Sequence, residues 1–446
     1  MFSLRIRKKM LTLQTQKRKI ANMKNPWSWV PSLYSAEGLP YVIVMQVAVL
    51  MYKQFDLSNT EIALYTSMFY LPWTIKPLWS PFIDMYKTKR WWIITMQALI
   101  GAAFAGIAFT IPTDFWLQAT IAFFWLLAFS SATHDVAADG FYMLGLDEGQ
   151  QSMFVGIRST FYRLASLFGS GVLIMIAGNL QTMLKGSVKY SWSLIFYGLT
   201  GIFIALMLWH ARALPKPKTD KGLTGNISFN DVLKELWETI KSFFTKMPLK
   251  EVILATCFML LYRMPEGLLV KITPLFLIEP QSGGGLGLSP QEIGFVQGTV
   301  GVIGLTLGGI LGGVLVSRDG LKKWLWPMVF AITIPDAVYI YLSMALPENF
   351  LLINVCIAIE QFGYGFGFTA YMMYLIYYSR GEHKTSHYAL CTAFMALSMM
   401  IPGLFSGWLQ ETVGYRMFFI IVMALCAITF LVSALVKIDP HFGKKE

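Results

Sequence analysis

The sequence predicts an all-α polytopic membrane protein with twelve transmembrane helices in two pseudo-symmetric halves of six. Of its 446 residues, 55% are hydrophobic and 14% are charged, whereas about 25% of a typical soluble protein is charged. Apolar runs of about twenty residues, the length that an α-helix needs to cross a bilayer, recur along the chain. We predict spans at 29–52, 61–83, 91–111, 115–145, 152–178, 190–210, 250–278, 290–317, 324–346, 350–379, 386–409 and 413–437.

The formal net charge of +11 fits this topology. Most Lys and Arg residues fall in segments that an even number of spans places on the same side as both termini. Because positive residues concentrate on the cytoplasmic side, both termini are expected in the cytoplasm. The basic charge therefore indicates orientation in a lipid bilayer and not a nucleic-acid partner. The four cysteines lie in apolar runs without metal-ligand spacing, so we expect buried packing residues and no metal site.

The connection 211–249 divides the chain. It begins with a polar segment rich in Pro and Gly, which is typical of a linker. It continues as ISFNDVLKELWETIKSFFTKM, whose apolar spacing predicts an amphipathic helix on the inner membrane face. We expect residues 1–22 either to be a mobile tail or not to belong to the native protein, which would then start at Met23. The predicted organisation is a tail (1–26), a six-helix bundle (27–211), a linker (212–249), a second six-helix bundle (250–437) and a tail (438–446).

Three sequence features repeat in the same order in the two halves. Glu37-Gly38-Leu39 in the first span recurs as Glu266-Gly267-Leu268 in the seventh span. The segment 57–62, LSNTEI, recurs as LSPQEI at 288–293, and each copy fits a capping box that opens a helix. The loops after these two helices also match. Parallel repeats of this kind place a substrate site near the bilayer midplane, between the halves.

Ionisable residues interrupt two consecutive apolar runs. An ionised side chain at bilayer depth is costly and tends to serve a pathway or a binding site. Asp135 and Asp139 lie four residues apart and share one helix face. An alternative is that these carboxylates neutralise arginines and only hold helices together, and that the neighbouring histidine has a structural hydrogen bond. The candidates for proton coupling are Asp135, Asp139, Glu37, Glu266 and His134.

Other polar and aromatic residues of the spans are candidates for substrate binding. An arginine binds a substrate carboxylate in bidentate fashion, and aromatic rings stack on sugar faces. Three alternatives stay open: Lys76 snorkels to the interface, Arg263 pairs with Glu266, and the aromatic residues anchor the spans at the membrane surface. The candidates are Lys76, Arg158, Arg163, Arg263, Glu360, Gln361, Tyr34, Trp73 and Tyr364.

Two internal loops resemble the signature of the major facilitator superfamily, Gly-x-x-x-Asp-Arg-x-Gly-Arg-Lys-Lys. The first, 80–90, keeps the acid and the basic cluster but begins with Ser80. The second, 313–323, is close to the pattern, with Ser317 where the pattern has Asp. The resemblance implies the major facilitator fold. It also implies a conformational latch formed by Asp84, Lys89, Arg90, Gly313, Arg318 and Gly320.

The first half also resembles the AmpG-type muropeptide permeases, which are related to acetyl-CoA transporters. The resemblance rests on segments 37–40, 71–84 and 131–139 and continues to Arg163. It implies a monomeric importer in the bacterial inner membrane, driven by a proton gradient without another cofactor. The implied substrate is N-acetylglucosaminyl-anhydro-N-acetylmuramic acid or its peptides. His134 stands where those proteins have Gln, and Gly140-Phe141 departs from their Ala-Tyr.

The sequence therefore predicts a secondary active transporter that works as a proton symporter, and not an enzyme. It contains no phosphate-binding loop, no paired metal-ligand spacing and no nucleophile elbow. Three other functions stay open: an importer of other glycosides or small sugars, a membrane sensor without transport, and a nucleotide-linked carrier. The last would require a larger basic cluster facing the cavity.

Overall fold

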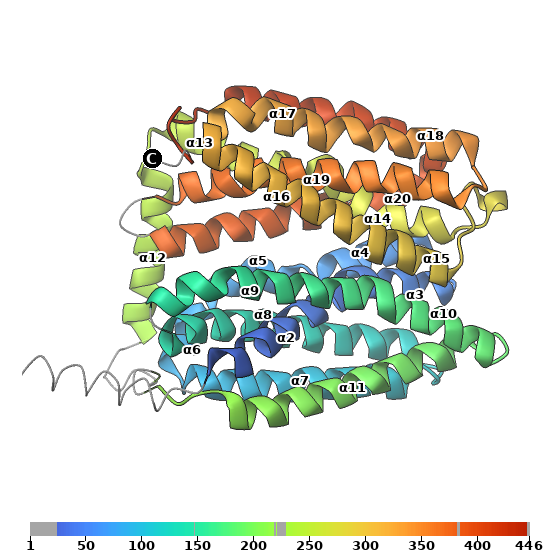
Figure 1. The fold of residues 1–446 in the computed structure, drawn as a ribbon, viewed down its shortest axis with the longest axis horizontal. Helices are drawn as coiled ribbons and strands as arrows, with labels where there is room; N and C mark the ends of the chain where they lie inside the picture. The colour runs from blue at the N-terminus through green and yellow to red at the C-terminus, as the bar shows by residue number, and fades with distance from the viewer. Residues whose placement is uncertain (1–24, 147, 218–219, 221–228, 381–383, 444–446) are drawn as a thin grey trace, which may run out of the picture.

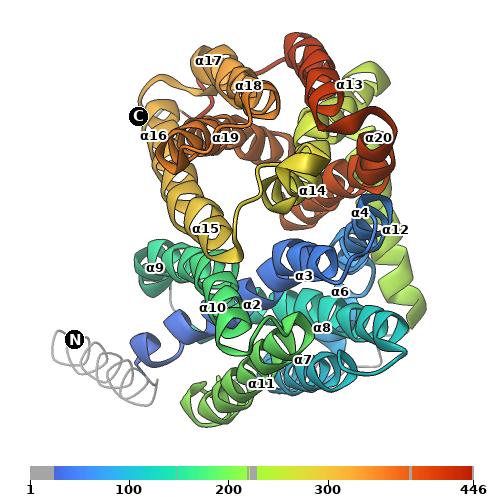
Figure 2. The ribbon, with the colours of Figure 1, turned by 90° about the vertical axis from the view of Figure 1, so that its right-hand side faces the viewer.

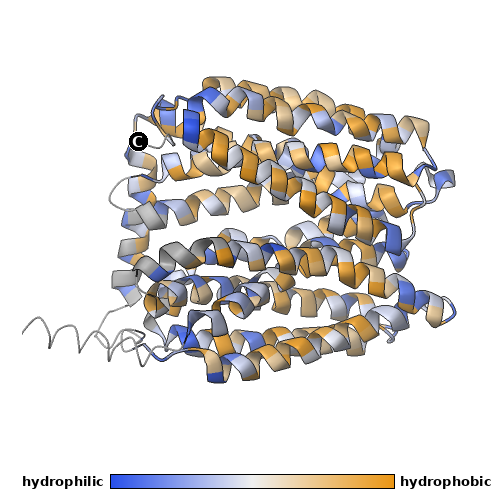
Figure 3. Cartoon of the chain, viewed as in Figure 1, coloured by the Kyte–Doolittle hydropathy of each residue, from blue (hydrophilic) through white to orange (hydrophobic). Residues whose placement is uncertain are grey.

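A computed structural model describes the chain except residues 1–24, 147, 218–219, 221–228, 381–383 and 444–446. The described part is helical, and it contains no β-strand. The long helices lie side by side along one direction (Figure 1). Apolar residues make up much of the length of these helices in Figure 3, as expected of helices that face lipid.

The helices before the linker form an N-terminal group. Two π-helical segments, η2 (Ile43–Val47) and η4 (Phe168–Leu173), each join two α-helices into a longer rod. Short 3-10 segments are η1 (Pro26–Ser28) and η3 (Lys76–Leu78). The α-helices are α2 (Val30–Val42), α3 (Ala48–Gln54), α4 (Asn59–Met68), α5 (Leu71–Ile75), α6 (Ser80–Met85), α7 (Lys89–Thr110), α8 (Trp116–Gly145), α9 (Glu148–Leu167), α10 (Ile174–Met183) and α11 (Val188–Ala213).

The helices after the linker form a C-terminal group, which lies above the N-terminal group in Figure 2. They include the π-helical η6 (Gly294–Gly301) and the 3-10 segments η5 (Gln281–Gly283) and η7 (Ile334–Asp336). The α-helices are α13 (Leu249–Leu261), α14 (Met264–Ile278), α15 (Pro290–Ile293), α16 (Val302–Asp319), α17 (Leu321–Thr333), α18 (Ala337–Ala345), α19 (Phe350–Tyr378) and α20 (Lys384–Leu435).

Within the described residues, ten helical stretches are long and apolar enough to cross a membrane. The predicted span 61–83 is not among them, because the chain there is divided into α4, α5, η3 and α6. Pro72, Pro77 and Pro81 lie at the first turns of the later pieces, where proline ends the preceding helix. The last two predicted spans, 386–409 and 413–437, both fall in α20, which consists of two helices joined at Gly414, where the backbone is not helical (φ 75°, ψ 164°).

The repeated motifs form the same local structures in both groups. The capping boxes are confirmed, because Ser58 and Ser289 each accept a hydrogen bond from the backbone of the glutamate three residues later. Gly38 and Gly267 both allow close helix packing. A Cβ atom at Gly38 would lie 3.0 Å from the Tyr162 carbonyl oxygen, and one at Gly267 would lie 2.9 Å from that of Ser398.

The linker contains the predicted helix, α12 (Phe229–Thr245). It runs across the ends of both groups of helices (Figure 1). Phe243 is buried, with its ring 5.0 Å from that of Tyr378 and 5.9 Å from that of Phe394. The side chain of Val232, one of the apolar residues of this segment, lies outside the described residues.

The two groups contact each other at the end opposite α12, which we call the far end. The Lys53 ammonium lies 2.5 Å from the Glu279 carboxylate there, and the Asn59 amide donates to Gln410 over 2.5 Å. The π-helical segments also meet, since a Cβ atom at Gly298 would lie 2.0 Å from the Gly171 Cα atom. These contacts close the gap between the groups at the far end.

Candidate functional site

A cavity of about 560 Å³ lies between the two groups. Its volume is within the range of small-molecule sites, about 300–1,000 Å³. Both groups contribute hydrogen-bonding and aromatic side chains to it, so that a solute in the cavity would contact both. Its lining includes Tyr41, Gln46, Tyr162, Arg163, Ser166 and Ser170 from the N-terminal group, and Glu266, Thr273, Gln297, Tyr339, Glu360, Gln361, Tyr364, Phe368 and Thr369 from the C-terminal group.

Arg163 lines this cavity, whereas Arg158 does not. The two lie five residues apart on α9, which turns their side chains about 140° from each other. Within the described part of the chain, Arg163 has no acidic side chain within 4 Å. Its guanidinium is therefore not taken up by an ion pair among these residues, and its role in substrate binding stays a prediction.

Asp135 forms an ion pair beside the cavity with another predicted residue. Its carboxylate lies 3.5 Å from the Lys76 ammonium and accepts a hydrogen bond of 3.2 Å from the Trp73 indole. The side chains of Lys76 and Asp135 are 23% and 16% exposed. α8 places the aspartate, and the proline-rich segment after α4 places both of its partners. Neither Lys76 nor Trp73 lines the cavity.

Asp139, one turn along α8, pairs with Arg158 at 2.8 Å and accepts a 3.2 Å hydrogen bond from Tyr34. The Arg158 guanidinium also lies 4.4 Å from the centre of the Tyr34 ring, a cation–π contact. Glu37 is buried nearby, and its Oε2 atom has no hydrogen-bond partner within the described part of the chain. The charged side chains that act on Glu37 are those of the two ion pairs, Lys76–Asp135 and Arg158–Asp139.

His134 points away from this cluster. Its Nε2 atom accepts a hydrogen bond of 3.0 Å from the Gln97 amide, and the Gln97 carbonyl oxygen accepts one of 3.0 Å from His210. Ser32 lies 2.9 Å from the other ring nitrogen of His210. His134, Gln97 and His210 are fully buried. This chain joins α8, α7, α11 and α2, an arrangement that suits a structural role.

Arg263 lies at the break between α13 and α14 and is buried. Its guanidinium donates a hydrogen bond to the Tyr364 hydroxyl and lies 4.6 Å from the centre of the Phe368 ring. It has no carboxylate within 4 Å among the described residues, so the predicted pair with Glu266 is not a direct ion pair here. Arg263 therefore lies behind the cavity wall and holds two of its aromatic rings.

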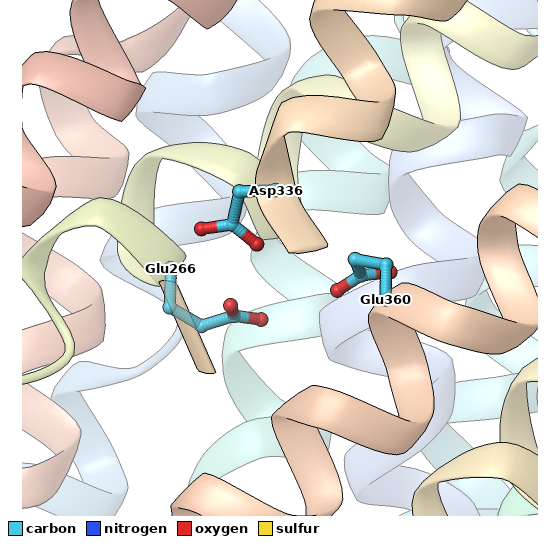
Figure 4. A group of neighbouring side chains, drawn as sticks. All are labelled: Glu266, Asp336 and Glu360. Carbon is cyan, nitrogen blue, oxygen red and sulfur yellow. The ribbon is translucent and has the colours of Figure 1, made fainter. Parts of the chain in front are cut away.

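Glu266 and Glu360 are brought together with a residue that the sequence did not indicate, Asp336. One carboxylate oxygen of each lies within 4.8 Å of the others (Figure 4). All three side chains are buried, with exposures of 7%, 3% and 4%. At an effective dielectric constant of about 20, two unit charges 4.8 Å apart repel each other by roughly 3.5 kcal/mol. Three ionised carboxylates here would therefore require a positive charge among them.

Several lining residues were not predicted. Gln46, Gln297 and Tyr162 line the cavity, and Asp336 lies just behind it. Each is a polar residue within an apolar run, which was the available signal. Sequence periodicity cannot show which face of a span meets the cavity, because that depends on how neighbouring helices pack.

The predicted latch residues lie at the end that carries α12. The backbone N–H groups of Lys89 and Arg90 donate to the Asp220 carboxylate of the linker over 2.7 and 3.1 Å. In the second loop, Arg318 pairs with Asp319 at 2.9 Å. Gly320 follows with φ 89°, a conformation that favours glycine.

For the remaining predicted latch residues, Gly313 and Asp84, the described part of the structure gives no contact that would support a latch. Gly313 has open space around its Cα atom, and the side chain of Asp84 lies outside the described residues. The superfamily pattern has its Asp at position 317, which is Ser in this chain. The acidic residue of the second loop is Asp319, two residues later.

The family model of the Major Facilitator Superfamily matches residues 33–285 and 261–446. The chain belongs to this superfamily. It is 24% identical over 361 residues to the anhydromuropeptide permease of Escherichia coli K12, a match that covers 79% of this chain and 68% of the permease. It is 25% identical over 421 residues to a protein of Rickettsia conorii named as transporter AmpG 4, covering 90% and 94% of the two chains.

Solved structures agree on the fold of this superfamily member. The nucleoside transporter NupG superposes with a TM-score of 0.68 at 14% identity, over 92% of this chain and 98% of that one. The inward-open xylose transporter XylE from E. coli superposes with a TM-score of 0.64 at 9% identity, over 90% of this chain and 94% of that one. The chain is therefore a multi-pass membrane transporter of a small molecule, distantly related to the anhydromuropeptide permeases.

Proposed function

We propose that this transporter imports an amino-sugar-containing cell-wall fragment, similar to an anhydromuropeptide, or a related saccharide, by proton symport. The observation that carries the proposal is the composition of the cavity. It combines Arg163, which has no ion-pair partner among the described residues, with hydroxyl, amide and tyrosine groups from both helix groups. Amide and hydroxyl groups bind sugar hydroxyls, tyrosine rings pack on sugar faces, and a guanidinium binds a carboxylate. The name of the E. coli relative supports this choice of substrate.

Alternating access follows from the same geometry. A solute in the cavity contacts both groups, so their relative movement would open the cavity to one membrane side and then to the other. In this conformation, the Lys53–Glu279 pair and the Gly171–Gly298 contact hold the far end closed. We propose that the end with α12 and both termini faces the cytoplasm of a bacterial inner membrane, and that one chain is sufficient for transport.

Uptake into proteoliposomes with an inward proton gradient tests the substrate. Labelled anhydromuropeptide would compete with unlabelled N-acetylated sugars and with plain sugars. We expect gradient-dependent uptake that anhydro-muramyl sugars block and plain sugars do not. If other glycosides competed, the protein would instead be an importer of other glycosides or small sugars. Binding without flux would contradict transport and favour a sensor.

Arg163→Gln separates the two substrate classes. If Arg163 binds a substrate carboxylate, the variant should raise KM for a fragment with a free carboxylate by about tenfold or more, since a charge-assisted hydrogen bond is worth about 1.5–3 kcal/mol. KM for a neutral saccharide should change much less. Equal effects on both solutes would argue that Arg163 only shapes the cavity.

A further inference from the structure

We propose that Glu266, Asp336 and Glu360 together bind the cation whose gradient drives transport. This inference deepens the proposed function and rests on it. The ligand is a monovalent cation held by carboxylate oxygens, either as protons on the carboxyl groups or as Na⁺. The carboxylates come from three separate elements, α14, η7 and α19, and their oxygens lie within 4.8 Å of one another (Figure 4).

The free oxygen of Glu266 is the observation that points to a ligand. Glu266 is 93% buried, and its Oε2 atom has no hydrogen-bond donor among the residues that the structure describes. Its carboxylate is directed toward Asp336 and Glu360 (Figure 4). A buried carboxylate oxygen without a partner loses its hydration and gains nothing in return, so such oxygens are normally satisfied. A bound cation or an added proton would satisfy this oxygen.

The groups around the three carboxylates do not neutralise them. The Tyr339 hydroxyl donates to Glu360 over 2.8 Å, and the Gln361 amide donates to the same carboxylate over 3.0 Å. The Cys426 thiol lies 3.8 Å from Asp336. All three of these neighbours are uncharged donors.

Arg263 is the nearest positive charge to Glu266, but its guanidinium is directed to Tyr364. No Lys, Arg or His lies within 4 Å of the three carboxylates in the described part of the chain. In the N-terminal group, Asp135 and Asp139 each have a basic partner, and Glu37 has Lys76 and Arg158 among its electrostatic neighbours. Among the described residues, the three carboxylates of the C-terminal group have no basic partner in direct contact.

The site also has access to the transported solute. Glu266, Glu360 and Tyr339 line the cavity, whereas Asp336 lies behind them. A cation bound here would thus lie next to the solute and would change the charge of the cavity wall. Since two members of the site are cavity residues, binding of the cation and of the solute would be coupled through direct contact.

The first experiment requires no solute. The full-length protein in lipid nanodiscs is studied by infrared difference spectroscopy after a pH step, and separately after addition of Na⁺. A proton site predicts a protonated-carboxyl band that titrates with pH, and a Na⁺ site predicts a shift of the carboxylate bands with Na⁺. Either signal should be lost in Glu266→Gln and in Glu360→Gln and kept in the exposed control Glu348→Gln. The proposal would be overturned if the wild-type protein gave neither signal, or if the signals were unchanged in both variants.

The second experiment measures transport of whichever saccharide the wild-type protein accumulates. A tenfold gradient of a monovalent cation supports about tenfold accumulation of a solute moved with one cation. Glu266→Gln and Asp336→Asn should reduce the ratio of inside to outside solute concentration to about one, while exchange of labelled for unlabelled solute continues. Retained exchange also shows that the variants fold. Accumulation near the wild-type level in both single variants would overturn the cation site but would leave saccharide transport standing.

Discussion

The Lys53 ammonium lies 2.5 Å from the Glu279 carboxylate and joins the two helix groups at the far end. Lys53 follows the first π-helical segment, and Glu279 ends the helix that carries Glu266. Both side chains are about one-fifth exposed. This ion pair can form only while the far end is closed, so it contributes to the equilibrium between the two access states.

Reversing one charge should open the far end. Lys53→Glu replaces attraction with repulsion, and a partly exposed pair of this kind is worth at most about 1 kcal/mol, or a roughly fivefold change in the ratio of closed to open states. A cysteine at Gln46 should then react faster with a maleimide added at the far side. The double variant Lys53→Glu/Glu279→Lys should restore the slow rate. If the double variant reacted as fast as the single variant, this pair would have no part in closure.

The Gly171–Gly298 contact should be more sensitive than the ion pair. A Cβ atom at Gly298 would lie 2.0 Å from the Gly171 Cα atom, so Gly298→Ala forces the two groups apart at that point. We expect transport to fall by tenfold or more, with the far end open to labelling. Gly198→Ala is the matched control, because nothing lies within 4 Å of its Cβ position. Normal transport by Gly298→Ala would show that the two groups do not approach this closely during the cycle.

A double substitution distinguishes the two roles of Asp135. If Asp135 only neutralises Lys76, the single variant Asp135→Asn leaves a partly buried lysine unpaired, and removal of both charges relieves it. Lys76→Met/Asp135→Asn should then recover gradient-driven accumulation that Asp135→Asn loses. We expect this recovery, because the driving cation is proposed to bind in the C-terminal group. A double variant that exchanges solute but does not accumulate it would place a coupling proton on Asp135.

Gln97→Leu should affect stability and not substrate binding. The substitution leaves His134 and His210 without their amide partner in a fully buried site. An unsatisfied buried polar group costs about 1–3 kcal/mol, so the thermal unfolding temperature in detergent should fall while KM stays constant. Gln118→Leu, at an exposed position of α8, is the control and should change neither quantity. A raised KM in Gln97→Leu would indicate that this network reaches the cavity.

Much of the fold could be predicted from local sequence patterns. Apolar runs predicted most of the spans, and Ser58 and Ser289 predicted two helix starts through their capping boxes. The predicted boundary between the last two spans agrees with the break at Gly414, where two helices meet. Hydropathy did not predict that proline residues divide 61–83 into shorter helices, because the chain there stays apolar while its backbone changes direction.

The sequence by itself determined that the chain spans a membrane, repeats its own architecture and carries ionisable residues within its spans. These properties depend on composition and on spacing along one helix. Only the tertiary structure decided which of those residues meet. It paired Asp135 with Lys76 and Asp139 with Arg158, turned His134 toward Gln97, and brought Asp336 beside Glu266 and Glu360. The physical reason is that a side chain's partners lie on neighbouring helices. Their identity depends on how those helices are rotated and broken, and helical periodicity does not contain that information.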